Sequence, residues 1–194
     1  LSKKDKIETI FEERGQFALD LVKTFIEWGE EDAILIYDDY GFKKGPLMSP
    51  INFRKYIFPW LEKIFNAAHE EGVKIILHSC GEIYDLFEDI VKMGVDAVHP
   101  IEPTTANPDY DIFKLHEKFG DQICFMGNVS PQSLADKDAE DIKAYTEKLI
   151  RDLAPGGGYI LSSGHSINPA VKLENFLAMH EILQDLGDYP ISND

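Results

Sequence analysis

The sharpest chemical signal in the sequence is the tripeptide His78-Ser79-Cys80, which follows an apolar run that ends at Leu77. Residues i and i+2 of an extended chain point to the same side, so the imidazole of His78 and the sulfur of Cys80 can reach one ion. Zinc favours nitrogen and sulfur ligands, and a catalytic zinc usually keeps three protein ligands and one open position. The alternative is that His78 forms ordinary hydrogen bonds and Cys80 is a small buried apolar residue.

A third ligand for such an ion has to come from another part of the chain. His165 is our first choice, because it follows a separate apolar run in the segment Ser162-Ser163-Gly164-His165. A serine nucleophile in this segment is disfavoured, because the Gly-x-Ser-x-Gly pattern of a nucleophile elbow is missing. We therefore predict His78, Cys80 and His165 as metal ligands, with three residues in reserve: Glu102, Asp38 and His99.

Other polar residues suggest catalysis or binding beside the ion. The adjacent carboxylates of Asp38 and Asp39 repel each other, which raises one pKa and suits a general acid or base, or a cation-binding pair. A turn near Gly41 explains the same two residues equally well. The amide of Asn128 can bind a ligand, or can shape the turn before Ser130-Pro131, which reads as a helix start. We assign catalysis to Asp38, Asp39 and His78, and substrate binding to Asn128, Ser163 and Glu102.

These residues need a scaffold that brings them together, and the pattern of apolar residues predicts a sheet that can do so. Five short runs rich in Ile, Val, Leu or Phe predict buried parallel strands: residues 33–37, 73–77, 97–99, 123–126 and 159–161. Nearly every unusual polar residue comes just after one of these runs. In barrel enzymes the carboxyl ends of the strands form one rim, so we expect a single site built from five loops.

The segments between the runs have a helical period. Residues 1–30 predict an N-terminal helical segment that stops near Gly29. Ser49-Pro50 starts a long apolar stripe, and Pro59 predicts a break in it near Phe58. Further stripes predict helices over residues 83–91, 112–119 and 138–153, and Asn168-Pro169 opens a final one.

Alternating strands and helices suit an open doubly wound sheet or part of a barrel. A nucleotide-binding doubly wound fold needs a glycine-rich turn after an early strand, whereas Gly156-Gly157-Gly158 precedes a strand. A complete barrel needs about 250 residues, and this chain has 194. We therefore predict an α/β fold of the (β/α)8 TIM-barrel type, partial, with about the last five βα units and without the first strands. Residues 1–194 are expected to form a single domain.

Composition excludes several classes of function. The chain has 19 Lys and Arg against 35 Asp and Glu, a formal net charge of −16. Binding to nucleic acid or to an anionic membrane depends on basic residues, so both are disfavoured. No apolar run reaches the roughly 18–20 residues of a membrane span, and the lysine-rich start is not followed by the apolar stretch of a signal peptide. We expect a cytoplasmic protein, and its two cysteines are too few for a disulfide framework.

The ordered set of these motifs resembles the uroporphyrinogen decarboxylase superfamily, from about residue 31 to residue 186. The segments that carry the resemblance are Asp38-Asp39-Tyr40-Gly41, Gly45-Pro46-Leu47-Met48-Ser49-Pro50, Leu77-His78-Ser79-Cys80-Gly81, Gly127-Asn128-Val129, Gly157-Gly158-Tyr159-Ile160-Leu161-Ser162-Ser163-Gly164-His165 and Glu174-Asn175-Phe176. The resemblance implies a (β/α)8 barrel whose N-terminal portion is missing here.

The resemblance also implies one of two chemistries. The decarboxylase of haem (porphyrin) biosynthesis, a lyase, binds a polyanionic tetrapyrrole without a metal, whereas the methyltransferase branch uses zinc and a corrinoid (cobalamin). His78-Ser79-Cys80 matches the zinc motif of the methyltransferases, in which the third ligand is commonly a cysteine where this chain has His165. The sequence has only three arginines, Arg14, Arg54 and Arg151, to pair many carboxylates.

Three functions follow as expectations. The first is a zinc-dependent methyltransferase that moves a methyl group between a small substrate and a corrinoid, which a partner protein can carry. The second is decarboxylation of uroporphyrinogen III, and the third is an inactive partial-barrel binding module. Because an incomplete barrel leaves unpaired strand edges, we also expect a homo-oligomer or pairing with another chain.

Overall fold

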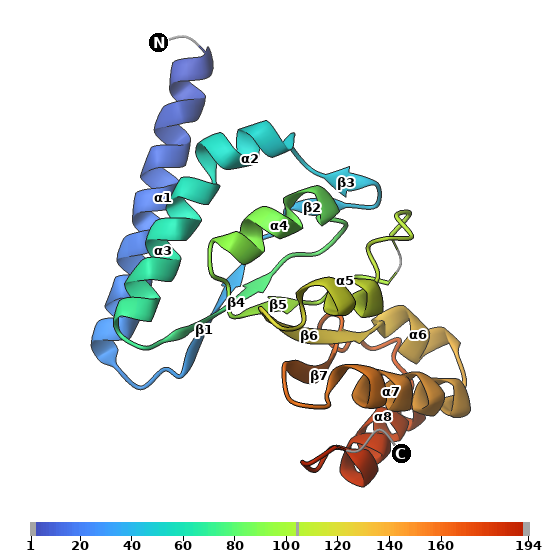
Figure 1. Cartoon of the computed structure of the whole chain (residues 1–194). Coiled ribbons are helices and arrows are strands. Elements are labelled where there is room, and N and C mark those ends of the chain that lie inside the picture. The colour runs from blue at the N-terminus through green and yellow to red at the C-terminus, as the bar shows by residue number, and fades with distance from the viewer. Residues whose placement is uncertain (1–2, 104, 192–194) are drawn as a thin grey trace.

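The computed structural model describes residues 3–103 and 105–191, with the backbone alone for residues 3–5. Helices and strands alternate along most of the chain (Figure 1). The helices are α1 (Lys3–Trp28), α2 (Pro50–Tyr56), α3 (Phe58–Glu70), α4 (Tyr84–Lys92), α5 (Ile112–Phe119), α6 (Pro131–Asp136), α7 (Ala139–Leu153) and α8 (Leu173–Leu186). The strands are β1 (Ala33–Tyr37), β2 (Gly41–Phe42), β3 (Gly45–Pro46), β4 (Lys74–His78), β5 (Ala97–His99), β6 (Cys124–Val129) and β7 (Tyr159–Ser163).

Five of these strands form one parallel sheet in the order β1-β4-β5-β6-β7. Each strand pairs with the next sheet strand along the chain, so the order runs in one direction and has no switch point of the doubly wound kind. All five strands therefore place their carboxyl ends at the same edge. The register sets Tyr37 beside His78 and His78 beside His99.

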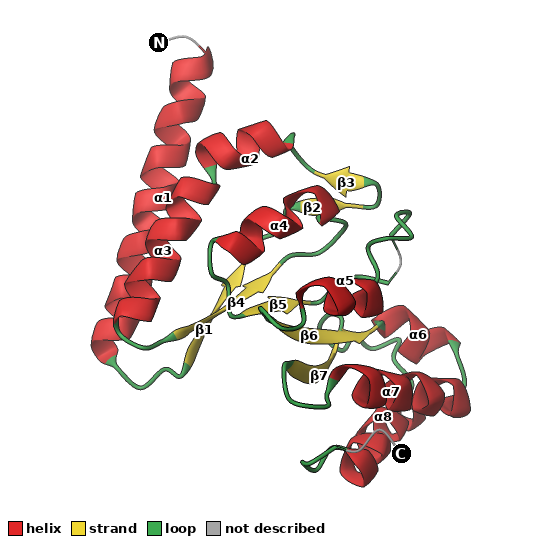
Figure 2. Cartoon of the chain, viewed as in Figure 1, coloured by secondary structure: helices red, strands yellow, loops and turns green. Residues whose placement is uncertain are grey.

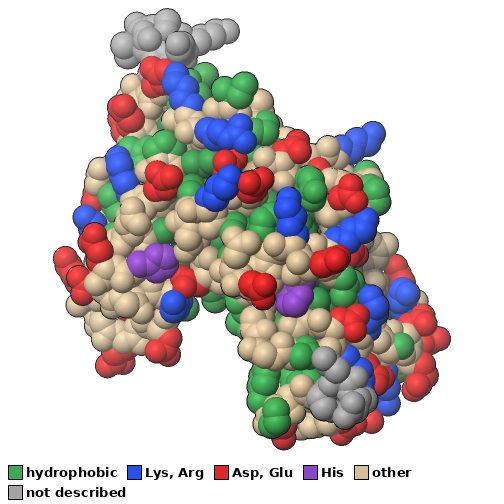
Figure 3. Space-filling view, viewed as in Figure 1, with side chains coloured by type: hydrophobic (Ala, Val, Ile, Leu, Met, Phe, Trp, Pro, Cys, Tyr) green, Lys and Arg blue, Asp and Glu red, His purple; other side chains and the backbone are tan. Residues whose placement is uncertain are grey.

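Helices cover one face of the sheet, whereas the other face is exposed to solvent. Side chains on the helix side, such as Leu77, Val98 and Phe125, are fully buried in the hydrophobic core. On the opposite face Leu35 of β1 and Ile160 of β7 are 49% and 44% exposed. Figure 2 shows the helices gathered around one side of the strands, and Figure 3 shows a hollow between the lobe with α1 and α3 and the lobe with α7 and α8. Helices outside and an open inner face are what a partial barrel requires, so the predicted fold class is confirmed.

The predicted strands are all present, and β6 and β7 extend further toward the site than predicted. The predicted break near Phe58 is confirmed, because α2 ends at Tyr56 and α3 begins at Phe58. One expectation needs correction, and one element was missed. Asn168 does not open the last helix; its side chain accepts the backbone N–H of Ala170 in a turn, and α8 begins at Leu173. The hairpin of β2 and β3 was not predicted.

Among the described residues, no helix is both long and apolar enough to span a membrane.

Candidate metal centre

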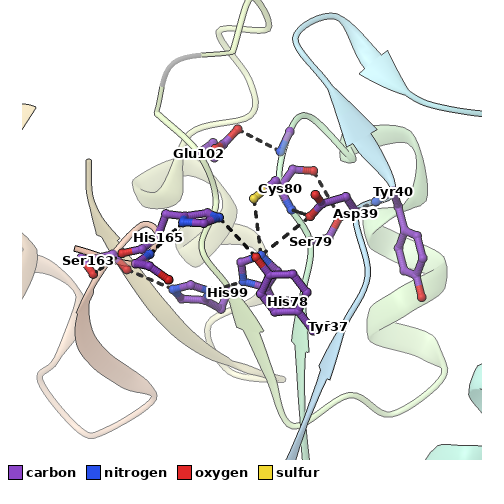
Figure 4. Close-up of polar contacts among 12 residues, drawn as sticks. Tyr37, Asp39, Tyr40, His78, Ser79, Cys80, His99, Glu102, Ser163 and His165 are labelled. Carbon is purple, nitrogen blue, oxygen red and sulfur yellow. Dashed lines mark hydrogen bonds and ion pairs between the residues drawn. The ribbon is translucent and has the colours of Figure 1, made fainter. Parts of the chain in front are cut away.

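The three predicted ligands lie at the ends of two different strands and meet at one point. His78 ends β4, Cys80 comes two residues later, and His165 follows β7. One ligand atom from each residue lies within 4.8 Å of the other two, and within the described residues no other cluster of three such side chains meets this criterion. Nε2 of His78 is 3.4 Å from Sγ of Cys80. Figure 4 shows these side chains pointing toward one another.

A close approach of two loops makes this arrangement possible. Gly41, after β1, donates its N–H to the carbonyl oxygen of Cys80, and Gly81 lies against Gly41 backbone to backbone. A Cβ atom on either glycine would overlap the other loop, and Gly81 also has a φ of +77° that favours glycine. The two glycines therefore hold the loop of Cys80 against the loop of Asp39.

The hydrogen bonds of His99 determine which ring nitrogen of His78 keeps a lone pair available for an ion. Nε2 of His99 is 3.0 Å from the carbonyl oxygen of Ser163, which can only accept, so this nitrogen carries the proton. In a neutral ring Nδ1 of His99 is then an acceptor, and Nδ1 of His78, 2.6 Å away, must donate to it. This assignment leaves the lone pair of His78 on Nε2, directed toward Cys80. His99, a reserve ligand in the sequence analysis, is buried and has both ring nitrogens engaged in hydrogen bonds, so it is placed to orient His78. The ligand role of His78 stays a prediction.

Burial keeps both rings neutral. Burial, with a smaller contribution from the neighbouring His99, lowers the pKa of His78 to about 4. Burial also lowers the pKa of His99. A neutral imidazole is the form that binds a metal ion.

His165 is less prepared than His78 to bind an ion. Its Nδ1 accepts the backbone N–H of Ser166 at 2.8 Å, so its proton is on Nε2 and is donated to the hydroxyl of Tyr37 at 3.2 Å. An ion bound at Nε2 would require this proton to move to Nδ1 and the bond from Ser166 to break. His165 must therefore rearrange on binding.

Negative charge surrounds the thiol. Burial, together with the carboxylates of Asp39 and Glu102, raises the pKa of Cys80 to about 12. Asp39 accepts the N–H of Cys80 at 3.0 Å and lies 3.8 Å from Nε2 of His78, and Glu102 accepts the N–H of Gly81 at 2.9 Å. Acidic neighbours oppose a thiolate but stabilise a divalent cation, which would in turn stabilise the thiolate.

Asp38 and Asp39 face different surroundings. Burial and the charge of Asp39 raise the pKa of Asp38, the direction expected for adjacent carboxylates. Asp38 lines a pocket of about 270 Å³ together with Tyr37, Tyr40 and Trp60. Asp39, by contrast, contacts the loop of Cys80. The pair thus divides between a small pocket and the candidate metal centre.

Tyr37 is the residue that sequence reasoning missed. Its ring stacks on His78 with a centroid separation of 3.9 Å, and its hydroxyl bonds to His165. The sequence does contain a signal for Tyr37. Residues two apart in an extended chain point to the same side, so the candidate Asp39 indicated that Tyr37 also faces the site.

The predicted substrate-binding residues are mostly engaged within the protein. Asn128 is 1% exposed; its amide donates to the carbonyl oxygen of Ile101, and its oxygen accepts from the hydroxyl of Tyr145. Ser163 gives its carbonyl to His99 and donates its hydroxyl to the carbonyl of His165. These bonds favour the structural alternative for Asn128, and a ligand contact by either residue stays a prediction.

The fold and the site together define a class: a partial barrel of the TIM type with polar groups of several strand ends on one rim. A sequence model of the uroporphyrinogen decarboxylase (URO-D) family matches residues 1–186, and the chain belongs to this family.

Similar proteins carry two kinds of name. Uroporphyrinogen decarboxylase of Geobacter sulfurreducens is 26% identical over 155 residues, which are 80% of this chain and 42% of that protein. Uroporphyrinogen decarboxylase 2, chloroplastic, of Arabidopsis thaliana is 25% identical over 159 residues, 79% of this chain and 36% of that protein. Among solved structures, a methyltransferase from Methanosarcina mazei matches with a TM-score of 0.74 and 24% identity, over 96% of this chain and 51% of that one. The chain thus spans about half the length of these proteins or less, and the last match supports the fold alone.

Proposed function

We propose that this chain carries the metal centre of a zinc-dependent methyltransferase that moves a methyl group between a small substrate and a corrinoid. The observation that carries the proposal is the convergence of His78, Cys80 and His165 within 4.8 Å at the rim of the sheet. When bound, zinc supplies a Lewis acid that can lower the pKa of a substrate thiol or polarise a methyl donor.

The donor set fits zinc better than the hard cations. Calcium and magnesium prefer oxygen ligands, whereas two imidazoles and one thiolate suit zinc and leave a fourth position for a substrate. His78 offers a fixed lone pair through its bond to His99. Cys80 gives up its thiol proton on binding, and Asp39 fixes the loop that carries it. Within this chain these residues prepare the site.

Decarboxylation of uroporphyrinogen is the second candidate, because the curated relatives carry that name. Its substrate is a polyanion, and the rim near Cys80 has the carboxylates of Asp39 and Glu102. Two of the three arginines are engaged elsewhere: Arg54 pairs with Asp89 and Arg151 with Glu147. The charge of this rim therefore favours the first candidate.

Metal analysis of the 194-residue chain tests the proposal. After exposure to zinc and gel filtration, we expect about one zinc per chain in the parent and in Cys124→Ser, and a loss of most of it in Cys80→Ser. Cys124 is the matched control because it is the other cysteine of the chain and is also half-buried. A parent without zinc, or equal zinc in both variants, would contradict the metal centre. Loss of the methyl group from added methylcobalamin in the presence of a thiol tests the corrinoid separately.

A further inference from the structure

Tyr37 contacts two of the three predicted ligands from a strand that carries neither of them. Its ring is stacked on the imidazole of His78, with a centroid separation of 3.9 Å and an angle of 7° between the planes. Its hydroxyl lies 3.2 Å from Nε2 of His165, and this hydroxyl has no other hydrogen bond within the part of the chain that the structure describes. Tyr37 ends β1 and His165 follows β7, the two edge strands of the sheet. The contact therefore joins opposite edges of the sheet at the rim.

The two histidines are not equally ready for an ion. A hydrogen bond at Nδ1 leaves Nε2 of His78 with a lone pair. In His165, by contrast, Nδ1 accepts the backbone N–H of Ser166 and Nε2 donates its proton to Tyr37. Figure 4 shows this Nε2 on the side of the ring that faces His78 and Cys80. The nitrogen of His165 that faces the other two residues is thus the one that has a proton and no lone pair.

The backbone at His165 is anchored by hydrogen bonds, so a rearrangement is confined to its ring. Gly164 donates its N–H to the carbonyl oxygen of Val129 at 2.8 Å, and the hydroxyl of Ser163 donates to the carbonyl oxygen of His165 at 2.6 Å. Two hydrogen bonds restrain the ring, one from the backbone and one to the hydroxyl of Tyr37. The second is the one that a change of side chain can remove without a change in the backbone.

We propose that Tyr37 is a positioning residue that controls when His165 joins the ligand set. In the metal-free chain the hydroxyl keeps the proton of His165 on Nε2. His78 and Cys80 are therefore the prepared part of the site, and His165 completes it only after its ring releases Tyr37. This inference rests on the proposed function.

The hydroxyl and the ring of Tyr37 act in opposite directions. The hydroxyl opposes metal binding, because its bond to His165 exists only in the metal-free form. The ring favours binding, because an imidazole that gains positive charge from a bound ion is attracted more strongly to the face of an aromatic ring stacked on it. Substitutions that remove the hydroxyl alone, or the hydroxyl and the ring together, separate the two effects.

Competition with a chromophoric chelator for zinc tests the role of the hydroxyl. Tyr37→Phe keeps the ring, and we expect it to bind zinc about 3- to 10-fold more tightly than the parent, the equivalent of one hydrogen bond that the bound form does not make. Tyr189→Phe is the matched control, because it removes a hydroxyl that donates to the carbonyl oxygen of Ala154 at 3.0 Å, outside the candidate metal centre. Its affinity should equal that of the parent. An affinity of Tyr37→Phe equal to or below that of the parent overturns the proposal, since a loss would mean that Tyr37 supports His165 as a ligand.

The background His165→Ala shows where the hydroxyl acts. In this background Tyr37→Phe should leave the zinc affinity unchanged, because the two residues act through one contact. A gain that persists without the imidazole of His165 also overturns the proposal.

Tyr37→Leu tests the ring. We expect this variant to bind zinc at least about threefold more weakly than Tyr37→Phe, and circular dichroism establishes that both variants keep the fold of the parent. Equal affinities of the two variants would refute the contribution of the ring. A parent that binds no zinc contradicts the proposed function itself, whereas a parent that binds zinc without these differences contradicts this inference alone.

Discussion

The ability of the candidate metal centre to bind an ion depends on which ring nitrogens of His78 and His99 carry protons. In metal sites, the histidine nitrogen that does not bind the ion usually donates to a carboxylate, a carbonyl group or water. Here Nδ1 of His78 donates a hydrogen bond to Nδ1 of His99, and Nε2 of His99 donates in turn to the carbonyl oxygen of Ser163. The backbone of β7 therefore sets the tautomer of a side chain on β4 through one intervening ring.

Replacing His99 tests this chain of hydrogen bonds. His99→Leu removes the acceptor of His78 without leaving a large cavity, so Nδ1 of His78 loses its partner and the ring loses its fixed tautomer. We expect the zinc affinity to fall about 10- to 100-fold, as for other partners of metal ligands. Competition with a chromophoric chelator measures the change, and His180→Leu on the exposed side of α8 is the control. Equal affinities in the two variants would show that His99 does not prepare the site.

The thiol of Cys80 predicts how binding depends on pH. Without an ion its pKa is raised to about 12, so it is protonated at neutral pH and one proton must leave when an ion binds. The pKa of His78 is lowered to about 4, so that ring is already neutral. We therefore expect the zinc affinity to rise about tenfold per pH unit between about pH 6.5 and 8.5. Cys80→Ser should bind weakly and lose this slope; a flat profile in the parent would argue against a thiolate ligand.

At this scale the sequence indicated which side chains converge, but not the contacts that each one makes. Alternation in a strand joined His78 to Cys80, and the rule that strand ends share a rim added His165. The sequence did not predict that His99 hydrogen-bonds to His78 and to the carbonyl oxygen of Ser163, because His99 has the same residue type and the same strand-end position as His78. That distinction depends on ångström-scale distances between rings, which spacing along the chain does not determine.

Two loops, after β1 and after β4, hold the centre together through their glycines. Gly81→Ala combines an unfavourable φ of +77° with an overlap against Gly41. Gly72→Ala has nearly the same φ, +79°, and open space around the added methyl group. We expect the first variant to lower the free energy of unfolding by at least about 1 kcal/mol more than the second, since only it must separate the loops. Chemical denaturation measures both, and equal losses would mean that the close contact carries no energy.

At the opposite end of the sheet, Asp96 ties α3 to β4. Its carboxylate accepts from the side chains of Lys74 and His69 and from the N–H of Ile75. Partial burial opposes its ionisation, but these bonds outweigh it and lower the pKa of Asp96. The stabilisation is therefore complete above the ordinary aspartate pKa and is lost as the pH falls through the lowered value.

Replacing Asp96 tests this tie. We expect Asp96→Asn to lower the free energy of unfolding by about 1 kcal/mol at pH 7 and to flatten the loss of stability below about pH 4. Denaturation at several pH values measures both effects. Asp152→Asn, at an exposed ion pair of α7, should leave the acid profile unchanged. If Asp96→Asn keeps the acid dependence of the parent, another carboxylate is responsible for it.

Sequence patterns predicted elements well where the elements are long. The sheet strands are continuous apolar runs, and Pro59 placed the break between α2 and α3 within one residue. The hairpin of β2 and β3 has two residues in each strand, too few for any period to appear. The start of α8 was misplaced because Asn168-Pro169 forms a turn as readily as a helix start.

At the scale of the whole molecule, the open barrel gives one rim and one uncovered face. The five strands run in parallel, so the groups that can do chemistry lie at one rim, at the carboxyl end of the exposed inner face. A net charge of −16 and the carboxylates near Cys80 make that rim suited to a cation. The composition indicated the acidic character of the chain, but only the folded chain places carboxylates beside the candidate ligands.

The central claim is that one imidazole-imidazole-thiolate set binds zinc, and X-ray absorption at the zinc edge tests it most directly. For the zinc-loaded chain we predict one sulfur neighbour at about 2.3 Å and two nitrogen neighbours at about 2.0–2.1 Å, completed by one further light atom. The sulfur signal should disappear in Cys80→Ser and persist in Cys124→Ser. A spectrum of the parent with oxygen and nitrogen neighbours alone, or with a sulfur signal that survives Cys80→Ser, would contradict the claim.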